Sequence, residues 1–159
     1  MGVNTNFGST LAISSATTTT DTDTQGEFEA LSYTAVGSIE SIGPFGDTYT
    51  DVPFTGLGDS RTQHFKGSVD AGTISMTVGF DAADTGQDAI MTALADVTGV
   101  YAFRVQLGDG SSGSPSAPTT QFFLGRVMAA PLNVGATNNI VRRDVQIGII
   151  SAIIQADAV

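Results

Sequence analysis

The sequence predicts a mainly β protein, a β-sandwich or partly open barrel with one α-helix packed on it. Three observations predict this fold class. The 159 residues are only 14% charged and are rich in Thr, Ser and Gly, a composition that favours strands and turns. Several segments alternate apolar and polar residues with period two. A single segment, residues 84–97, places apolar residues at helical spacing. The length suits one domain, residues 1–159.

The first forty residues contain two expected strands joined by a polar connection. Residues 8–15 (GSTLAISS) predict a short strand. Residues 16–26 (ATTTTDTDTQG) are polar and of low complexity, so they predict a loop or an N-terminal arm. Residues 28–40 predict a second strand, because Leu31 and Tyr33 belong to an apolar set that alternates with polar residues.

The next segment, residues 42–61, is expected to be a long loop with apolar content. It holds two prolines and four glycines as well as large apolar side chains. A long structureless segment inside a compact domain is usually functional or disordered, and disordered segments are poor in aromatic residues. Two interpretations therefore stand as equals, ordering against a partner and an Ω-like loop packed on its own domain.

Strands dominate the rest of the chain. Residues 63–81 predict a strand, a kink at Ala71–Gly72 and a second strand. Asp84 predicts the N-cap of the helix, with Gln87 at capping-box spacing. The remaining expectations are two strands at 100–107 and 121–128, a flexible hairpin loop at 108–120, and a final strand or strand pair at 140–155.

The residue counts exclude several kinds of chemistry. The absence of Cys excludes disulfides, thiolate metal sites and Cys nucleophiles, and one His cannot form a three-His zinc site. His64 lies on the polar face of an expected strand and is interpreted as a surface residue. No catalytic, cofactor-binding or metal-binding residues are expected, and no cofactor. Arg142–Arg143 is expected to make a local ion pair with Asp144.

The charge is acidic and uneven along the chain. The net charge is -10, and the first sixty residues carry eight acids and no Lys or Arg. Six cations in all cannot neutralise many phosphates, which argues against a nucleic-acid-binding face. The acids form a solvated surface or a surface that must not bind nucleic acid. We expect no signal peptide and no membrane partner, since the longest apolar stretch, Ile147–Ile154, is too short to span a bilayer.

The order of these features resembles the major tail (tail tube) proteins of bacteriophages with long, non-contractile tails. The residues that carry the resemblance are GSTLAIS (8–14), FEAL (28–31), VGSIESIGP (36–44), DVPFTGL (51–57), RTQHFKG (61–67) and DAGTISM (70–76). Phe80–Asp81, one helix, a strand, the Asp109–Gly110 loop, another strand and a closing strand at 145–154 follow. Tube proteins of contractile tails and of secretion systems remain an alternative.

The resemblance implies a structural virion protein and not an enzyme. Such proteins form hexameric rings whose strands build a continuous inner barrel, and the stacked rings form the tube for genome ejection. Residues 42–61 would then stack the rings through Pro44, Phe45, Tyr49, Val52, Phe54 and Leu57. The polar strand faces would line the lumen, so that DNA passes without specific binding, with candidates Ser32, Thr34, Ser38, Glu40, Lys66, Ser68, Asp70, Ser75 and Thr77.

The same resemblance implies partners and a location. The partners are the chain itself, the tape measure protein, the tail terminator and distal tail proteins. The location is the virion tail, after assembly in the host cytoplasm. Two alternatives stay open: a monomeric or trimeric β-sandwich module for capsid decoration or adhesion, and a small hydrolase that uses two carboxylates distant along the chain.

Overall fold

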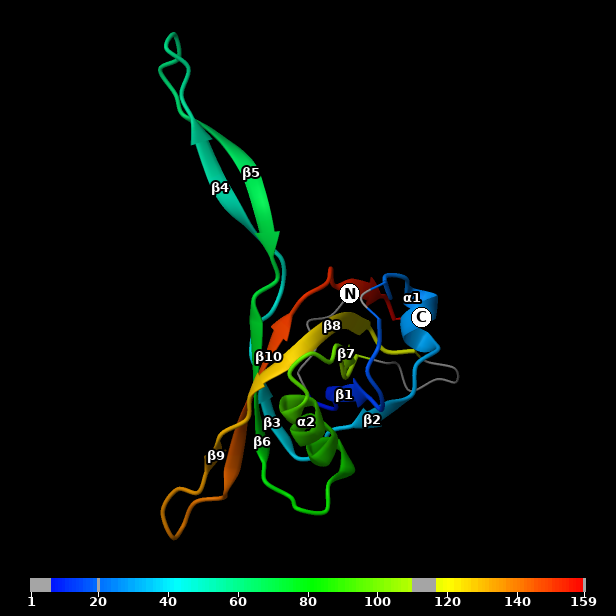
Figure 1. Ribbon diagram of the computed structural model, residues 1–159. Helices are drawn as coiled ribbons and strands as arrows, with labels where there is room; N and C mark the ends of the chain where they lie inside the picture. Colours follow the sequence, from blue (N-terminus) through cyan, green and yellow to red (C-terminus); the bar gives the residue numbers. More distant parts are fainter. Residues whose placement is uncertain (1–6, 20, 110–116, 159) are drawn as a thin grey trace.

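The computed structural model describes residues 7–19, 21–109 and 117–158. Within them, a nine-stranded antiparallel sheet has the order β2-β1-β7-β8-β10-β6-β3, with β11 on β8 and β9 on β10 (Figure 1). Its strands are β1 (Thr10–Ser14), β2 (Tyr33–Ala35), β3 (Ile39–Ile42), β6 (Thr73–Gly79), β7 (Tyr101–Gln106), β8 (Thr120–Ala129), β9 (Leu132–Asn133), β10 (Arg142–Ile149) and β11 (Ile154–Ala156). The two end strands, β2 and β3, are joined by only three residues, so the sheet curls into the partly open barrel that the sequence predicts.

The core of the barrel follows from the alternation along its strands. In β6, Ile74, Met76 and Val78 are buried while the residues between them point outward. The neighbouring strand β10 buries Val145 and Ile147 in the same way. Aromatic rings fill the centre: the Phe103 and Phe123 rings stack with centroids 5.5 Å apart. Period-two patterning thus gives β6 and β10 an apolar inner side and a polar outer side, whereas β7 and β8 also bury Ala102, Phe122 and Leu124 in a second cluster with Phe28.

Helix α2 (Thr85–Ala95) covers part of this core through buried Ile90 and Ala93. Asp84 is its N-cap: Oδ1 accepts from the Gly86 and Gln87 amides, and Oδ2 accepts from the Gly37 amide at 2.6 Å. The capping box expected from Gln87 does not form. Its side chain instead donates to the Gly79 carbonyl and accepts from the Asp81 amide, which ties the helix start to the end of β6.

The segment expected to be one strand over residues 28–40 is divided between a helix and two strands. Helix α1 (Gln25–Glu29) begins with a capping box between Thr24 and Glu27. The Phe28 side chain of this helix packs against Phe122, with ring centroids 5.6 Å apart. The preceding low-complexity residues are bound to the domain, since the Thr18 amide donates to the Val100 carbonyl. This part of the expected N-terminal arm is therefore held against the domain at Thr18.

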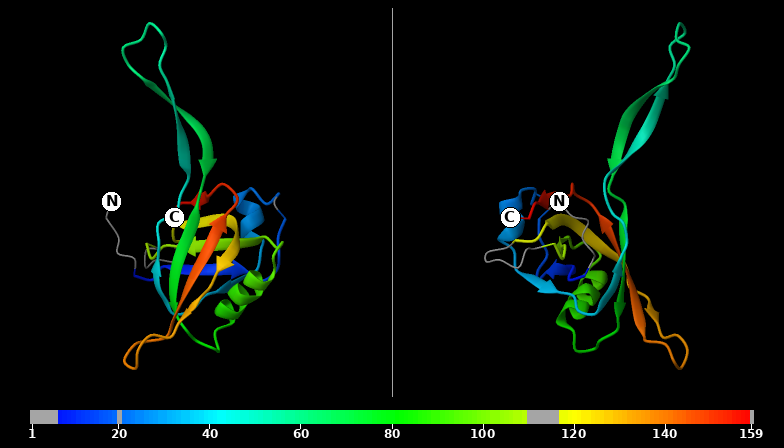
Figure 2. Two further views of the ribbon diagram at one scale, coloured as in Figure 1. Left: turned by 60° about the vertical axis from the view of Figure 1, so that its left-hand side comes forward. Right: turned by 180° about the vertical axis from the view of Figure 1, so that it is seen from behind.

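The segment expected to be a long loop over 42–61 contains a strand. β4 (Thr48–Phe54) pairs with β5 (Gln63–Asp70) in a separate two-stranded sheet. This hairpin projects away from the barrel (Figures 1 and 2). The expected kink after residue 70 is present: Gly72, with φ +73°, separates β5 in the hairpin from β6 in the barrel.

A second, shorter hairpin formed by β9 and β10 projects from the opposite end of the molecule (Figure 2). The C-terminal expectation of a strand pair is confirmed by β10 and β11. Of the expected loop 108–120, residues 110–116 lie outside the described residues. The protein is therefore a small barrel with one hairpin at each end, and the longer of the two is β4–β5.

Candidate assembly surfaces

The described residues contain no group of three His, Asp or Glu side chains that could hold a metal ion. His64 lies on the hairpin, where its Nδ1 is 2.7 Å from Asp51 Oδ2, and both side chains are more than half exposed. No described helix is long and apolar enough to cross a membrane. The candidate functional features of the described residues are therefore exposed surfaces.

One face of the β4–β5 hairpin is apolar and bare. The pairing sets Val52 opposite Phe65 and Phe54 opposite Gln63. Val52, Phe54 and Phe65 are 47%, 58% and 52% exposed. We call this surface the apolar hairpin face, formed by Thr50, Val52, Phe54, Gln63, Phe65 and Ser68. Large apolar side chains in a row on a projecting hairpin are typical of a protein contact surface.

The opposite hairpin face carries the charges. Lys66 Nζ lies 4.6 Å from the centroid of the Tyr49 ring, and Asp51 contacts His64. The strand pairing is irregular between Tyr49 and Asp51. Over these two positions of β4, the partner strand β5 advances by three residues, from Val69 to Lys66, and Val69 lies opposite Tyr49. Asp51, His64 and Lys66 lie in the regular register beyond this irregularity, so strand alternation places them on one side of the hairpin.

The structure divides the six predicted ring-stacking residues. Val52 and Phe54 lie on the apolar hairpin face, and Leu57 is fully exposed beyond the end of β4. Tyr49 lies on the charged face under Lys66. Pro44 is exposed at the base, but Phe45 packs into the molecule's own core, 5.7 Å from the Phe123 ring. Phe45 is therefore not available as an anchor in a partner.

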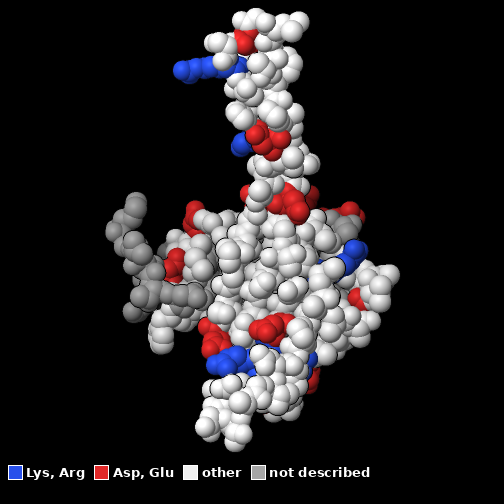
Figure 3. Space-filling model, turned by 90° about the vertical axis from the view of Figure 1, so that its left-hand side faces the viewer, with Lys and Arg blue, Asp and Glu red and all other residues white. Residues whose placement is uncertain are grey.

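The outward side of β3, β6 and β10 forms a second surface, which we call the outer sheet face. Thr77 Oγ1 donates to Asp144 Oδ1 at 2.9 Å, and Arg142 binds Glu40 through two nitrogens, with Nη2 3.0 Å from Oε1. Ser75 and Gln146 are exposed beside them. Figure 3 shows this side of the molecule, where acidic and basic groups lie together near the shorter hairpin and uncharged atoms cover most of the centre.

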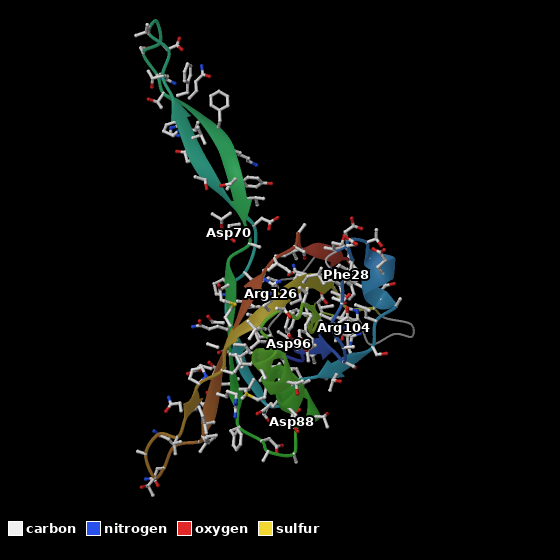
Figure 4. The ribbon with its side chains drawn as sticks, viewed as in Figure 1. Phe28, Asp70, Asp88, Asp96, Arg104 and Arg126 are labelled. Atoms are coloured by element: carbon white, nitrogen blue, oxygen red, sulfur yellow. The ribbon has the colours of Figure 1, made fainter. Side chains whose placement is uncertain are left out.

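The predicted lumen-lining residues fall into three groups. Glu40, Ser75 and Thr77 lie on the outer sheet face, with Ser38 just before it at φ +56°. Lys66 and Ser68 lie on the hairpin, with Asp70 at its base (Figure 4). Ser32 and Thr34 lie instead in or beside β2, where Thr34 is opposite Ile13 of β1. The candidates do not form one surface.

Sequence reasoning missed two members of the outer sheet face, Asp144 and Gln146. Their signal was present, because they alternate with Val145 and Ile147. The expected local ion pair of the Arg142–Arg143 dipeptide with Asp144 is wrong. Arg142 reaches Glu40, 102 residues earlier in the chain, because β3 and β10 flank β6 on either side.

A pocket of about 550 Å³ opens at the end of this face, close to the shorter hairpin. Its apolar lining comes from Ile39, Phe80 and Ile140, and its polar lining includes the Glu40–Arg142 pair. We call it the sheet-end pocket, lined by Ser38, Ile39, Glu40, Gly79, Phe80, Asp81, Ile140 and Arg142. Phe80 is 43% and Ile140 69% exposed, so the apolar wall is open to a partner.

The Glu40–Arg142 pair is expected to respond to acid. The hydrogen bond from Arg142 holds the pKa of the Glu40 carboxyl below its usual value of 4.5. At pH values between the folded and the unfolded pKa of Glu40, the unfolded chain binds more protons than the folded chain. The contribution of the pair to the free energy of unfolding is therefore complete above about pH 4.5 and is lost as the pH falls through the folded pKa. In an NMR titration, Arg142→Gln should raise the midpoint of the Glu40 carboxyl.

Glu27 provides the matched control for this titration. Its pKa is lowered by hydrogen bonds from the Asp23 amide and from the Thr24 hydroxyl and amide, far from the sheet-end pocket. Arg142→Gln should leave the Glu27 midpoint unchanged. Equal Glu40 midpoints in the wild type and the variant would show that the pair does not form in solution.

The comparisons with known proteins concern this same architecture. No family model and no curated protein matches the chain. Among solved structures, the SPP1 tail tube aligns with a TM-score of 0.67 at 13% identity, over 94% of this chain and 76% of that one. A chain of the anti-feeding prophage baseplate aligns with a TM-score of 0.67 at 10% identity, over 99% and 97%.

A chain from the tail of a gene transfer agent particle aligns with a TM-score of 0.61 at 15% identity, over 92% of this chain and 95% of that one. At these identities the likeness shows a shared fold. The mainly β fold that the sequence predicts is thus confirmed, and this chain shares the fold of a tail tube protein.

Proposed function

We propose that this protein assembles with copies of itself into stacked rings that form the tube of a phage-like tail. The observation that carries the proposal is the projecting β4–β5 hairpin with its bare apolar face. A two-stranded hairpin is at best marginally stable alone in water, so a partner that covers this face accounts for its composition. The fold shared with the SPP1 tail tube supports a second copy of this chain as that partner.

Six-fold rings are the symmetry we propose. The anti-feeding prophage baseplate is described as six-fold symmetrised, and the gene transfer agent tail as having C6 symmetry. A closed ring would also pair strand edges that are free in the single chain. Because these likenesses span phage-type tails and an injection-system baseplate, the proposal covers contractile as well as non-contractile tails. The non-contractile tail remains our first interpretation.

The outer sheet face is our candidate for the lumen wall. It carries hydroxyl and amide groups and few charges: Arg142 compensates Glu40, and the Asp144 carboxylate accepts from the Thr77 hydroxyl and keeps its negative charge. Such a wall offers few cations to bind phosphates, which supports a passive conduit through which DNA slides without specific binding. This agrees with the sequence-based expectation, since the low affinity for DNA would come from a shortage of free cations, with the Asp144 carboxylate leaving the face negative.

The remaining parts of the proposal concern the assembled tail. A tube of this kind would enclose a tape measure protein and would end on terminator and distal tail proteins. The protein would act in the virion tail after assembly in the host cytoplasm. The proposed role is structural, without catalysis.

Tube formation by the purified chain is the direct test. We expect rings or tubes by negative-stain electron microscopy and a concentration-dependent mass by analytical ultracentrifugation. A chain that stays monomeric or trimeric at high concentration, with and without its tail partners, would overturn the proposal and favour a capsid-decoration or adhesion module.

A further inference from the structure

We infer that the apolar hairpin face of one copy docks into the sheet-end pocket of the copy stacked on it. The inference rests on the proposed function and deepens it, because it names the surface that receives the hairpin. The contact joins Val52, Phe54 and Phe65 of one chain to Ile39, Phe80 and Ile140 of the next.

The two surfaces lie at opposite ends of one continuous ribbon. β5 leads through two residues into β6, so the hairpin leaves one end of β6 and the sheet-end pocket lies at its other end, at Gly79 and Phe80. The seven residues of β6 separate the two ends by about 23 Å at the usual rise per strand residue. Figure 1 shows the hairpin pointing away from the body along this direction. Different surfaces at the two ends of one molecule join copies head to tail.

Charge selects one hairpin face for this contact. From Thr50 to Phe54 the apolar hairpin face has no ionisable side chain, because Asp51, His64 and Lys66 lie on the other face and Asp70, opposite Thr48, lies at the base of the hairpin. In the sheet-end pocket, Glu40 and Arg142 compensate one another, and the Asp81 carboxylate accepts from the Ala83 amide. Docking therefore buries apolar side chains on both sides beside a compensated ion pair, and the charged hairpin face stays in water.

Docking along the side of the hairpin covers more of the exposed apolar surface than docking by its end. The three apolar side chains of the face lie along β4 and β5, whereas Leu57 stands alone beyond them. In the described chain β4 and β5 pair with each other and not with the main sheet, so no part of the barrel covers this face. A second copy supplies the cover that the single chain lacks.

Disulfide trapping tests the contact cleanly, because the chain contains no Cys. The variant Val52→Cys/Ile140→Cys has one cysteine on each proposed surface, at positions that are 47% and 69% exposed. A disulfide forms only where the two Cα atoms approach within about 7 Å. Mild oxidation of preformed tubes should give a ladder of linked dimers, trimers and longer chains on non-reducing gels, which collapses on reduction.

The matched control is Asp51→Cys/Ile140→Cys. Asp51 adjoins Val52 on the same strand but points from the charged face, so it should give at least about ten-fold less linked product, because its Cβ points away from the partner. If a double variant does not assemble alone, its two single variants are mixed with excess wild type, and linked dimers replace the ladder as the expected result.

Imaging the samples before oxidation separates the two proposals. Tubes that give no Val52–Ile140 link, or equal linking from Asp51, would overturn the docking inference and leave tube formation intact. A wild-type chain that forms no rings or tubes would overturn the proposed function, and the docking inference with it.

Discussion

Replacing Asp51–Gly67 by an Asn-Gly turn is expected to abolish tube assembly while the barrel stays folded. The replacement removes Val52, Phe54 and Phe65 and keeps the base of the hairpin, where the Thr50 and Ser68 hydroxyls lie 3.1 Å apart. Asn-Gly suits the tight turn that joins two antiparallel strands. The barrel core makes no use of the removed residues, so the melting temperature should change little. Electron microscopy and thermal unfolding measure the two outcomes.

A hairpin with only its charges removed is the control for this truncation. Asp51→Asn/His64→Gln/Lys66→Gln neutralises the charged face and keeps the apolar hairpin face. We expect this variant to form tubes. Tubes of normal length from the truncated chain would show that the hairpin is dispensable for stacking. A deletion of residues 46–56 would be less selective, because it would remove β4 and leave β5 without its partner strand.

Phe123→Ala should cost about 3–5 kcal/mol of unfolding free energy, the usual range for a buried Phe truncated in a packed core. Phe123 is fully buried, and its ring lies 5.5 Å from Phe103 and 5.7 Å from Phe45. The substitution leaves a cavity between these two rings at the centre of the barrel. Urea unfolding of the unassembled chain, followed by circular dichroism, measures the loss as a lower midpoint.

Phe65→Ala removes the same ring from the apolar hairpin face and is the matched control. Because Phe65 is 52% exposed, its loss should change the stability of the unassembled chain by about 0.5 kcal/mol or less. Its effect should appear in assembly instead, as a higher concentration needed for tubes. Similar losses of stability from Phe123→Ala and Phe65→Ala would mean that the hairpin packs on its own barrel in solution.

Much of the barrel could be predicted from local patterns. Period-two alternation in residues 73–80 places Ile74, Met76 and Val78 together, and the barrel buries all three. The helix at 84–97 was recognisable from Asp84 and its apolar spacing, because a cap and a helical stripe are local features. These signals depend only on near neighbours in the chain.

The misassigned segments show where local sequence patterns fail to predict the structure. Residues 28–40 alternate like one strand, yet the Thr24–Glu27 capping box starts a helix whose Phe28 packs beside Phe122. The capping box was legible in the sequence, but the contact that holds so short a helix comes from a strand nearly a hundred residues later. Phe45 was similarly grouped with the stacking residues, although Phe123 and the core receive it.

The sequence by itself determined a mainly β domain, core positions such as Ile74, Met76 and Val78, and an apolar segment that needs an explanation, because side-chain alternation and caps are properties of adjacent residues. Only the tertiary structure decided how the surfaces are assembled. It paired β4 with β5, and so separated an apolar from a charged face, and it brought Glu40 to Arg142 across β6. Strand pairing over long separations depends on the packing of the whole barrel, and that packing alone placed a bare hairpin and an open pocket at its two ends.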